Sequence, residues 1–177
     1  MGKSSLDLLF SKLGRDGRCD LRKFDPSEGS DERQYCCAAF NLPVGQVART
    51  TYGTHPEYHT SADNKDFVRL DLFPDTIAEI ENILKLHENC QPLDRIQPYC
   101  ELQLGKRGLY PNVNSPLTWE NSSDSLLDHR QQLRAIAYIL SYADGAHSLL
   151  DISDMTGIGL AELSRIVDKL RDMDLLK

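Results

Sequence analysis

The sequence predicts a chain of two unlike parts, a mixed α/β region followed by a small all-α helix-turn-helix domain. Three observations lead to this prediction. Apolar residues recur at helical spacing through residues 124–177, turn-forming residues separate short apolar runs before residue 73, and four prolines interrupt residues 91–123. We therefore expect a partial domain in residues 1–90, an irregular linker in residues 91–123 and a helical domain in residues 124–177.

Composition sets the broad class of the protein. Of the 177 residues, 40% are hydrophobic and 27% charged, which is typical of a soluble globular chain, and the formal net charge is −7. Nucleic acids and anionic membranes select clustered lysine and arginine, so neither is an expected partner. The five cysteines, an odd number without a C-x-x-C pair, favour a reducing cytoplasm over a disulfide framework or a thiolate zinc site. No apolar run approaches the roughly 20 residues of a membrane-spanning helix.

The N-terminal region begins with a predicted amphipathic helix. Residues 5–13 place their apolar side chains on one helical face, and Gly14 suits the position just after the helix. Residues 43–50, "PVGQVART", are the best strand prediction in the loop-rich stretch that follows. Residues 66–73 fit either a strand or the start of a helix.

A longer helix is predicted for residues 74–90. Asp75 or Thr76 can accept hydrogen bonds from the free N–H groups of its first turn. The apolar residues at helical spacing are Ile77, Ile80, Ile83, Leu84 and Leu86.

Three helices are predicted in the C-terminal region. The first closes at Gly145. In the second, Ser148 and Asp151 have the S-x-x-D spacing of a capping box, and Gly157 ends the helix. The third covers residues 160–173, and the tight turn before it makes a helix-turn-helix arrangement. We expect the core of this domain to contain Leu133, Ile136, Leu140, Leu150, Ile152, Leu163, Ile166, Val167 and Leu170.

A helix-turn-helix suggests DNA binding, but the charge of this one argues against it. The third helix balances three acidic residues against three basic ones, and residues 124–177 hold nine Asp and Glu against six Lys and Arg, a net charge of −3. A domain that reads a DNA groove must offset a dense phosphate charge. We therefore favour a packing or protein-interaction role, and expect DNA binding to be weak and unspecific.

His55 and His59, in the stretch "HPEYHTSADN", raise the question of a metal site. They stand four residues apart, but Pro56 between them argues against a helical zinc pair. Zinc needs three or four converging ligands, so one histidine in a polar loop is more often a solvated residue than a ligand. The charged run "DER" at residues 31–33 has the same plain interpretation, a solvated turn.

Residues 29–64, which begin "GSDERQYCCAAFNLPVG", carry a family resemblance together with "QLGKRGLYP" at 103–111 and the closing helices. The sequence resembles the aminopeptidase-like proteins with a C-terminal winged-helix domain. This family occurs in bacterial polysaccharide biosynthesis clusters and is similar to the two-zinc M28 aminopeptidases. The resemblance spans residues 20–177. It implies an α/β remnant of a three-layer aminopeptidase-like domain, followed by a small winged-helix-like domain.

The resemblance also implies functional roles for five residues. In such enzymes a late Tyr-His pair supplies the last zinc ligand and a neighbour to the reacting carbonyl. It therefore implies that His59 is a metal ligand and Tyr58 a catalytic residue. The "GSDERQY" segment resembles the family loop that borders the cleft, so Asp31, Glu32 and Arg33 are expected to line the substrate cleft.

The remaining parts of a two-metal site are not found in these residues. In the family, the bridging carboxylate, the other ligands and the general base lie upstream of the "GSDERQY" loop, and residues 1–25 contain no histidine. We therefore expect a truncated chain or fragment that binds zinc weakly or not at all and has no peptidase activity alone. Its N-terminal third should be poorly packed or bound to a partner.

Three classes of function are compatible with the sequence. The first is a metal-dependent peptidase or amidase that acts on an amino-acid or amino-sugar conjugate. The second is an interaction module whose helical domain binds a protein partner or a second copy of the chain. The third is a degenerate remnant without activity of its own.

Overall fold

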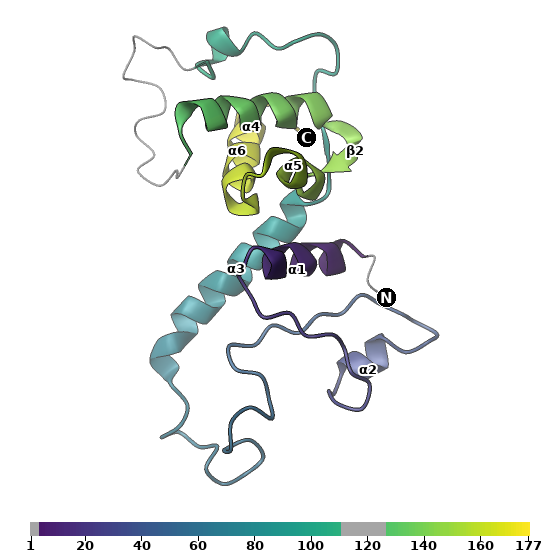
Figure 1. Ribbon diagram of the computed structural model, residues 1–177, viewed down its shortest axis with the longest axis vertical. Coiled ribbons are helices and arrows are strands. Elements are labelled where there is room, and N and C mark those ends of the chain that lie inside the picture. Colours follow the sequence, from purple (N-terminus) through teal and green to yellow (C-terminus); the bar gives the residue numbers. More distant parts are fainter. Residues whose placement is uncertain (1–3, 111–126) are drawn as a thin grey trace.

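The structure is a computed structural model that describes residues 4–110 and 127–177 (Figure 1). The helical bundle lies toward one end of the molecule and the irregular chain that follows α1 lies at the other, with one long helix running between them (Figure 1). No helix in the described residues combines the length and the apolar content needed to cross a membrane. The helices and strands are α1 (Ser5–Arg15), α2 (Glu32–Tyr35), α3 (Phe73–Asn89), β1 (Pro92–Asp94), α4 (His129–Tyr142), β2 (Asp144–Ser148), α5 (Leu149–Thr156) and α6 (Leu160–Asp172).

Helix α1 begins with a capping box. The Ser4 hydroxyl accepts a hydrogen bond from the Asp7 N–H at 3.1 Å, and the Asp7 carboxylate accepts one from the Ser4 N–H at 3.1 Å. Leu9 and Leu13 are buried, as the amphipathic pattern predicts. Gly14, expected just after the helix, lies inside its last turn. The helix is confirmed, and its predicted end is two residues short.

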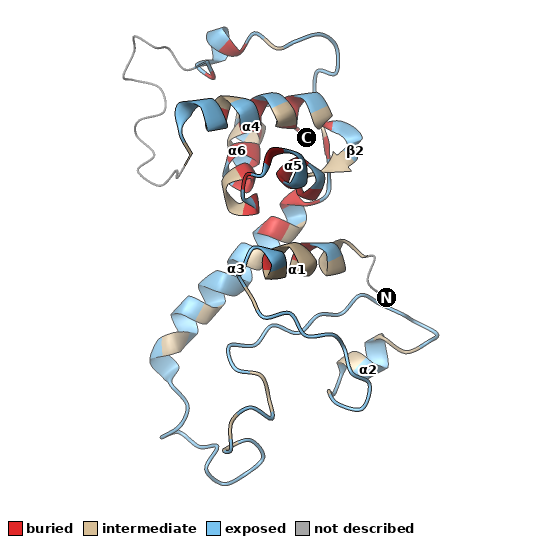
Figure 2. Ribbon diagram, in the orientation of Figure 1, coloured by how far each residue is buried: buried red, intermediate tan, exposed pale blue. Residues whose placement is uncertain are grey.

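Residues 16–72 run mostly as irregular chain over the surface (Figure 2). No residue from 14–85 is buried. The strand prediction for residues 43–50 is wrong, because a strand needs a hydrogen-bonded neighbour and the described part of the chain places none beside this segment. Residues 66–73 resolve as a helix start, with a short 3-10 turn leading into α3.

Helix α3 confirms the helix predicted over residues 74–90 and begins one residue earlier. Leu72 takes the cap position without a side-chain hydrogen bond, and Pro74 stands in the first turn, where its missing N–H has no helical partner to lose. Thr76 donates its hydroxyl to the Leu72 carbonyl at 3.0 Å. Asp75 lies in the first turn, where its negative charge interacts favourably with the helix dipole. The capping roles predicted for these last two residues are therefore wrong.

Part of the stretch predicted as an irregular linker is structured. β1 pairs with β2 in an antiparallel sheet, with Pro92 opposite Ser148. Leu93, Leu104 and Leu109 are buried in the common hydrophobic core. Residues 111–123 of the predicted linker lie outside the described residues. The described part of this stretch is thus attached to the helical bundle rather than separate from it.

Local sequence signals set the ends of the C-terminal helices. The Asp128 carboxylate accepts a hydrogen bond from the Gln131 N–H at 2.7 Å and caps α4. Ser148 and Asp151 form the predicted capping box of α5. Gly157 ends α5 in a left-handed conformation with φ of 70°, which favours glycine because a Cβ is strained there. The capping box and the glycine end that were predicted for α5 are confirmed.

The C-terminal domain is not all-α, which corrects the predicted fold class. Helix α4 ends at Tyr142, and Gly145, expected to close it, lies in β2 with φ of 79°. The five polar or small residues of β2 carry no strand pattern, and they form a strand because β1 lies alongside. In the described residues the only sheet is this two-stranded one, so the structure is helix-rich.

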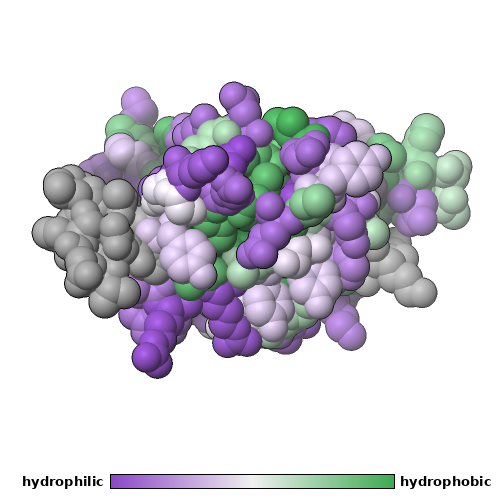
Figure 3. Space-filling model, turned by 90° about the horizontal axis from the view of Figure 1, so that it is seen from above, coloured by the Kyte–Doolittle hydropathy of each residue, from purple (hydrophilic) through white to green (hydrophobic). Residues whose placement is uncertain are grey.

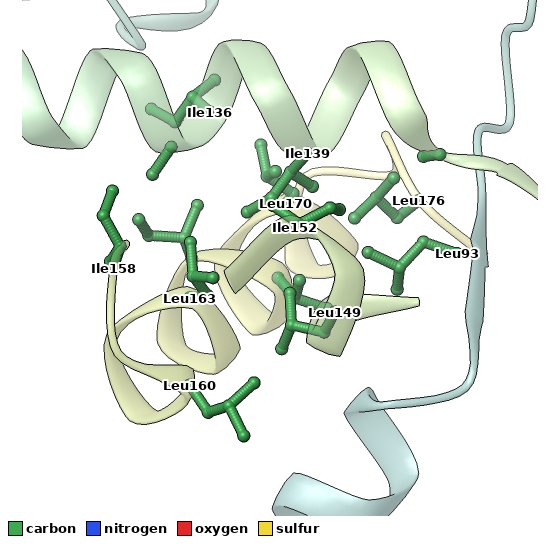
Figure 4. Close-up of a cluster of buried hydrophobic side chains, with 14 of the residues drawn as sticks. Leu93, Ile136, Ile139, Leu149, Ile152, Ile158, Leu160, Leu163, Leu170 and Leu176 are labelled. Atoms are coloured by element: carbon green, nitrogen blue, oxygen red, sulfur yellow. The ribbon is translucent and has the colours of Figure 1, made fainter. Parts of the chain in front are cut away.

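One hydrophobic core joins the bundle to α1, α3 and β1. Figure 4 shows its part within the bundle, with Leu93 beside it. Eight of the nine positions predicted as core are buried, and the ninth, Leu133, is partly buried against it. Leu9, Leu86 and Leu93 contribute from outside the predicted helical domain. Burying a leucine or isoleucine side chain contributes roughly 1.5–3 kcal/mol, so this shared core stabilises the two regions together.

Candidate functional site

Tyr58 and His59 lie side by side in an exposed loop. Their rings stack, with centroids 4.0 Å apart and planes inclined by 17°. His59 has a φ of 59°, a left-handed conformation that is uncommon for a residue other than glycine. The turn is held by Thr60, whose N–H and hydroxyl both donate to the Glu57 carbonyl, at 3.0 and 2.8 Å. Both rings are open to solvent.

His55 belongs to the same group of rings. It stacks on Phe67 with centroids 5.7 Å apart and meets Tyr58 edge-on at 5.8 Å. The Nδ1 atom of His55 is buried without a hydrogen-bond partner. Both histidine rings therefore contact Tyr58, and ring packing gives this loop its shape.

Asp31, Glu32 and Arg33 stand at the start of α2. Asp31 takes the cap position without a side-chain cap, and the Ser30 hydroxyl donates to its carboxylate at 3.4 Å. Glu32 is half-buried and lies against Gly29, whose φ of 85° and lack of a Cβ leave room for the carboxylate. Asp31 and Arg33 are exposed.

The structure brings together only part of the predicted site. In the described residues, no hydrogen bond, ion pair or ring contact joins α2 to Tyr58 or His59. The roles expected for these residues stay predictions. Arg33 faces a different feature, a shallow hollow of about 330 Å³ lined by Phe24, Pro26, Arg33, Cys36 and Cys37.

The described residues do not fit a zinc ion by themselves. A catalytic zinc takes three protein ligands and keeps one open position. In the ranges that the structure describes, no three His, Cys, Asp or Glu side chains are grouped closely enough to hold a metal. His59 is a single exposed imidazole stacked on a tyrosine. No reaction step through zinc follows from this geometry.

A second constellation of polar residues lies where α3 meets α6. Asn89, buried near the end of α3, donates its side-chain amide to Ser164 Oγ at 2.6 Å and to Asp168 Oδ1 at 2.9 Å. Its side-chain carbonyl accepts a hydrogen bond from Arg171, which also donates to the Lys177 carbonyl at 3.0 Å. Both polar atoms of the buried amide are paired, as buried polar groups require. We call this set the Asn89 junction.

Sequence reasoning missed Asn89. It stands three residues after Leu86 and one before Cys90, both of which are buried, so it shares their face of α3. A polar residue on a buried face indicates a hydrogen-bond partner elsewhere in the fold. The sequence contained that signal. However, the partner Ser164 is 75 positions further along the chain, so it could not be identified from the sequence.

Further polar contacts tie α1 to the rest of the molecule. Asp154 of α5 pairs with Lys12 at 3.1 Å and with Arg15 at 3.4 Å. Ser5 Oγ lies 3.0 Å from His87 Nε2 of α3. Ion pairs at a protein surface contribute about 1 kcal/mol at most, so these contacts orient α1 more than they stabilise it.

The basic side chains of α6 are engaged within the protein. Arg165 pairs with Glu162 at 3.0 Å, and Arg171 belongs to the Asn89 junction. Partial burial lowers the pKa of Lys169. These cations therefore do not form an open basic surface of the kind that DNA selects.

Two family models together cover most of the chain. Residues 91–177 match the winged helix-turn-helix family, which is the class that the bundle and its small sheet define. Residues 9–90 match a domain of unknown function, DUF4910. The two matches meet at the end of α3, beside the Asn89 junction.

Two relatives are similar to this chain over most of its length. A Clostridium acetobutylicum protein, provisionally described as a polysaccharide biosynthesis protein with an aminopeptidase-like domain, is 36% identical over 149 residues, covering 84% of this chain and 32% of the relative. A crystal structure of a provisionally assigned peptidase from Clostridium acetobutylicum matches with a TM-score of 0.68 and 30% identity, covering 99% of this chain and 36% of that chain. This chain spans about a third of the length of these relatives. The resemblance to aminopeptidase-like proteins with a C-terminal winged helix is confirmed, and the chain is homologous to part of one.

Proposed function

We propose that this chain forms the part of an aminopeptidase-like protein that carries the Tyr58–His59 pair and the winged-helix region, and that it does not hydrolyse peptides by itself. The observation that carries the proposal is the homology over 84% of this chain with only 32% of the relative. A metallo-aminopeptidase needs further ligands and a general base. On this proposal those groups come from outside the described residues, while His59 contributes one ligand and Tyr58 one residue of the cleft.

The geometry of the loop supports a site to which this chain contributes only some of the catalytic groups. Tyr58 and His59 are adjacent, exposed and stacked, so they are available to a surface that closes over them. Hydrolysis needs a base within hydrogen-bond reach of the attacking water, in a site that excludes bulk solvent. The loop by itself is open on the surface, with no buried residue from 14–85.

Metal analysis and a peptidase assay test the proposal. The 177-residue chain, dialysed after purification, is expected to hold far less than one zinc per chain and to show no turnover of aminoacyl p-nitroanilides. His59→Ala should change neither result. The proposal fails if one zinc is retained per chain and the chain shows chelator-sensitive turnover that His59→Ala abolishes. His129→Ala, an exposed histidine of α4, is the control and should preserve that turnover.

A second candidate function is a protein-interaction module that works through the winged-helix region. The observation that favours it over DNA reading is the engagement of Arg165 and Arg171 by Glu162 and Asn89. Side chains that already bind within the protein must give up those contacts to reach phosphates. If this second function is correct, the chain should bind DNA only weakly and without sequence preference.

A further inference from the structure

Helix α3 has an apolar face that nothing in the described residues covers. Phe73, Ile77, Ile80 and Leu84 recur at helical spacing, and their exposed fractions are 50%, 56%, 39% and 58%. At 1.5 Å per residue the face extends for about 16 Å along the helix. We call these four residues the apolar face of α3. The pale, exposed length of α3 is visible in Figure 2.

This face lies on the side of α3 opposite its buried side. Leu86, Asn89 and Cys90 pack into the bundle near the end of the helix. At 100° per residue, the apolar face points roughly 150° away from them, so the bundle cannot cover it. By contrast, the end of the molecule that is seen from above shows mostly hydrophilic residues around a narrow hydrophobic strip (Figure 3).

The segment that leads into α3 also exposes apolar side chains, between charged ones. Phe67, Val68 and Leu70, in the segment that leads into the helix, are exposed by 42%, 42% and 70%. Scattered exposed apolar residues are normal, whereas a periodic apolar face on a helix marks a surface that packs against something. A periodic face of this kind fits contact with another polypeptide surface.

The comparison with the crystal structure indicates what that surface is. The arrangement described for this chain recurs, over 99% of its length and with a TM-score of 0.68, in a chain of which it makes up 36%. We propose that the apolar face of α3 binds the rest of an aminopeptidase-like protein, meaning the part of such a protein that lies outside the region similar to this chain. The inference rests on the proposed function and adds to it the docking surface.

The charges beside the face define the chemistry of the partner. Glu81 and Glu88 follow Ile77 and Leu84 by four residues, so they stand next to the apolar face and on one side of it. Both carboxylates are exposed. The complementary surface is thus apolar, with lysine or arginine placed along one border.

Co-expression tests the inference. The tagged 177-residue chain is produced together with the unmatched two thirds of the Clostridium acetobutylicum relative, and the complex is captured on the tag and sized by light scattering. We expect a one-to-one complex. Ile77→Asp and Leu84→Asp should each reduce the affinity by about tenfold or more, because they place a carboxylate in an apolar contact. Lys85→Ala, on the same helix but away from the face, should leave it unchanged.

Three results overturn the inference. The first is capture of no partner by the wild-type chain, and the second is capture that Ile77→Asp leaves unchanged. The third is a homodimer of the isolated chain that Ile77→Asp dissociates, since a second copy then occupies the face. The substituted side chains are exposed, and circular dichroism verifies that each variant keeps its helices. Capture does not measure hydrolysis, so zinc-dependent turnover by the isolated chain overturns the proposed function alone.

Discussion

Asn89 is the residue on which the two regions of the chain depend most directly. It is 4% exposed, and its side chain bonds to Ser164, Asp168 and Arg171 of α6. A buried amide with both polar atoms paired fixes the register of one helix against another, because any shift leaves a polar group without a partner. The residue thus determines how α3 is placed on the winged-helix region.

We predict that Asn89→Ala lowers the free energy of unfolding by about 1–3 kcal/mol, the range for removing a buried hydrogen-bonding group. Urea denaturation followed by circular dichroism measures it. Glu88→Ala, an exposed neighbour on the same helix, is the control and should change stability by less than about 0.5 kcal/mol. Equal effects of the two substitutions would mean that the Asn89 junction does not stabilise the fold.

Cys90, the next residue, should behave as an inert thiol. Burial raises its pKa from the ordinary 9.0 to about 12. The neutral thiol is the form that the fold accommodates, so the stability linked to it is present below pH 9 and is lost as the pH rises toward 12. We predict that iodoacetamide at pH 8 modifies the exposed Cys100 but not Cys90 in the native protein, as peptide mass mapping detects.

The alkaline part of this prediction has its own measurement. The free energy of unfolding in urea is expected to fall between pH 9 and pH 12, and the fall should be smaller in Cys90→Ala, which has no thiol to ionise. The comparison uses the change with pH rather than the absolute stability, because the substitution also opens a small cavity. An equally steep fall in both proteins would show that the Cys90 thiol is not coupled to folding.

At the scale of helices and strands, the sequence was informative where the signals were local. The Ser148 and Asp151 capping box and Gly157 lie within ten residues of one another, and they defined α5 correctly. β1 was missed because its three residues become a strand only through pairing with Ser148, far along the chain. Residues 43–50 show the reverse error, since a strand-like pattern without a neighbouring strand stays irregular.

The candidate site could be predicted from the sequence to a similar degree. Tyr58 and His59 are adjacent in the chain, so finding them side by side required no knowledge of the fold. Their distance from Asp31 and Arg33 depends on how the irregular chain between them folds, which no local pattern encodes. The partners of Asn89 were hidden for the same reason.

Ile166 tests whether the helical stripes form one core. It is 5% exposed, between α6 and the rest of the bundle. We predict that Ile166→Asp unfolds the winged-helix region, because it buries a carboxylate without a partner. Arg165→Ala, which removes an exposed side chain that pairs with Glu162, should change stability by less than about 1 kcal/mol. Thermal unfolding compares them, and a cooperative transition near the wild-type temperature in Ile166→Asp would contradict the core described.

At the scale of the whole molecule, net charge decides between DNA and protein as the partner of the winged helix. The chain carries −7, and Arg165 and Arg171 of α6 are held by neighbouring side chains. We predict affinity for duplex DNA no better than roughly 1–100 μM at physiological salt, without sequence preference. A gel-shift titration against random duplex and the gene's own upstream region measures it. Nanomolar, sequence-dependent binding that Arg165→Ala removes would establish a DNA reader.

Helix α3 also has a dynamic consequence. Its buried residues, Leu86 and Asn89, are confined to the last turn, while its first turns carry exposed side chains. Backbone amides near Asn89 should therefore exchange with solvent deuterium only when the bundle unfolds, whereas those near Ile77 exchange through local fraying. A protein that covers Ile77 would slow the second process and leave the first unchanged. The protection gradient along this one helix thus reports whether its exposed half is occupied.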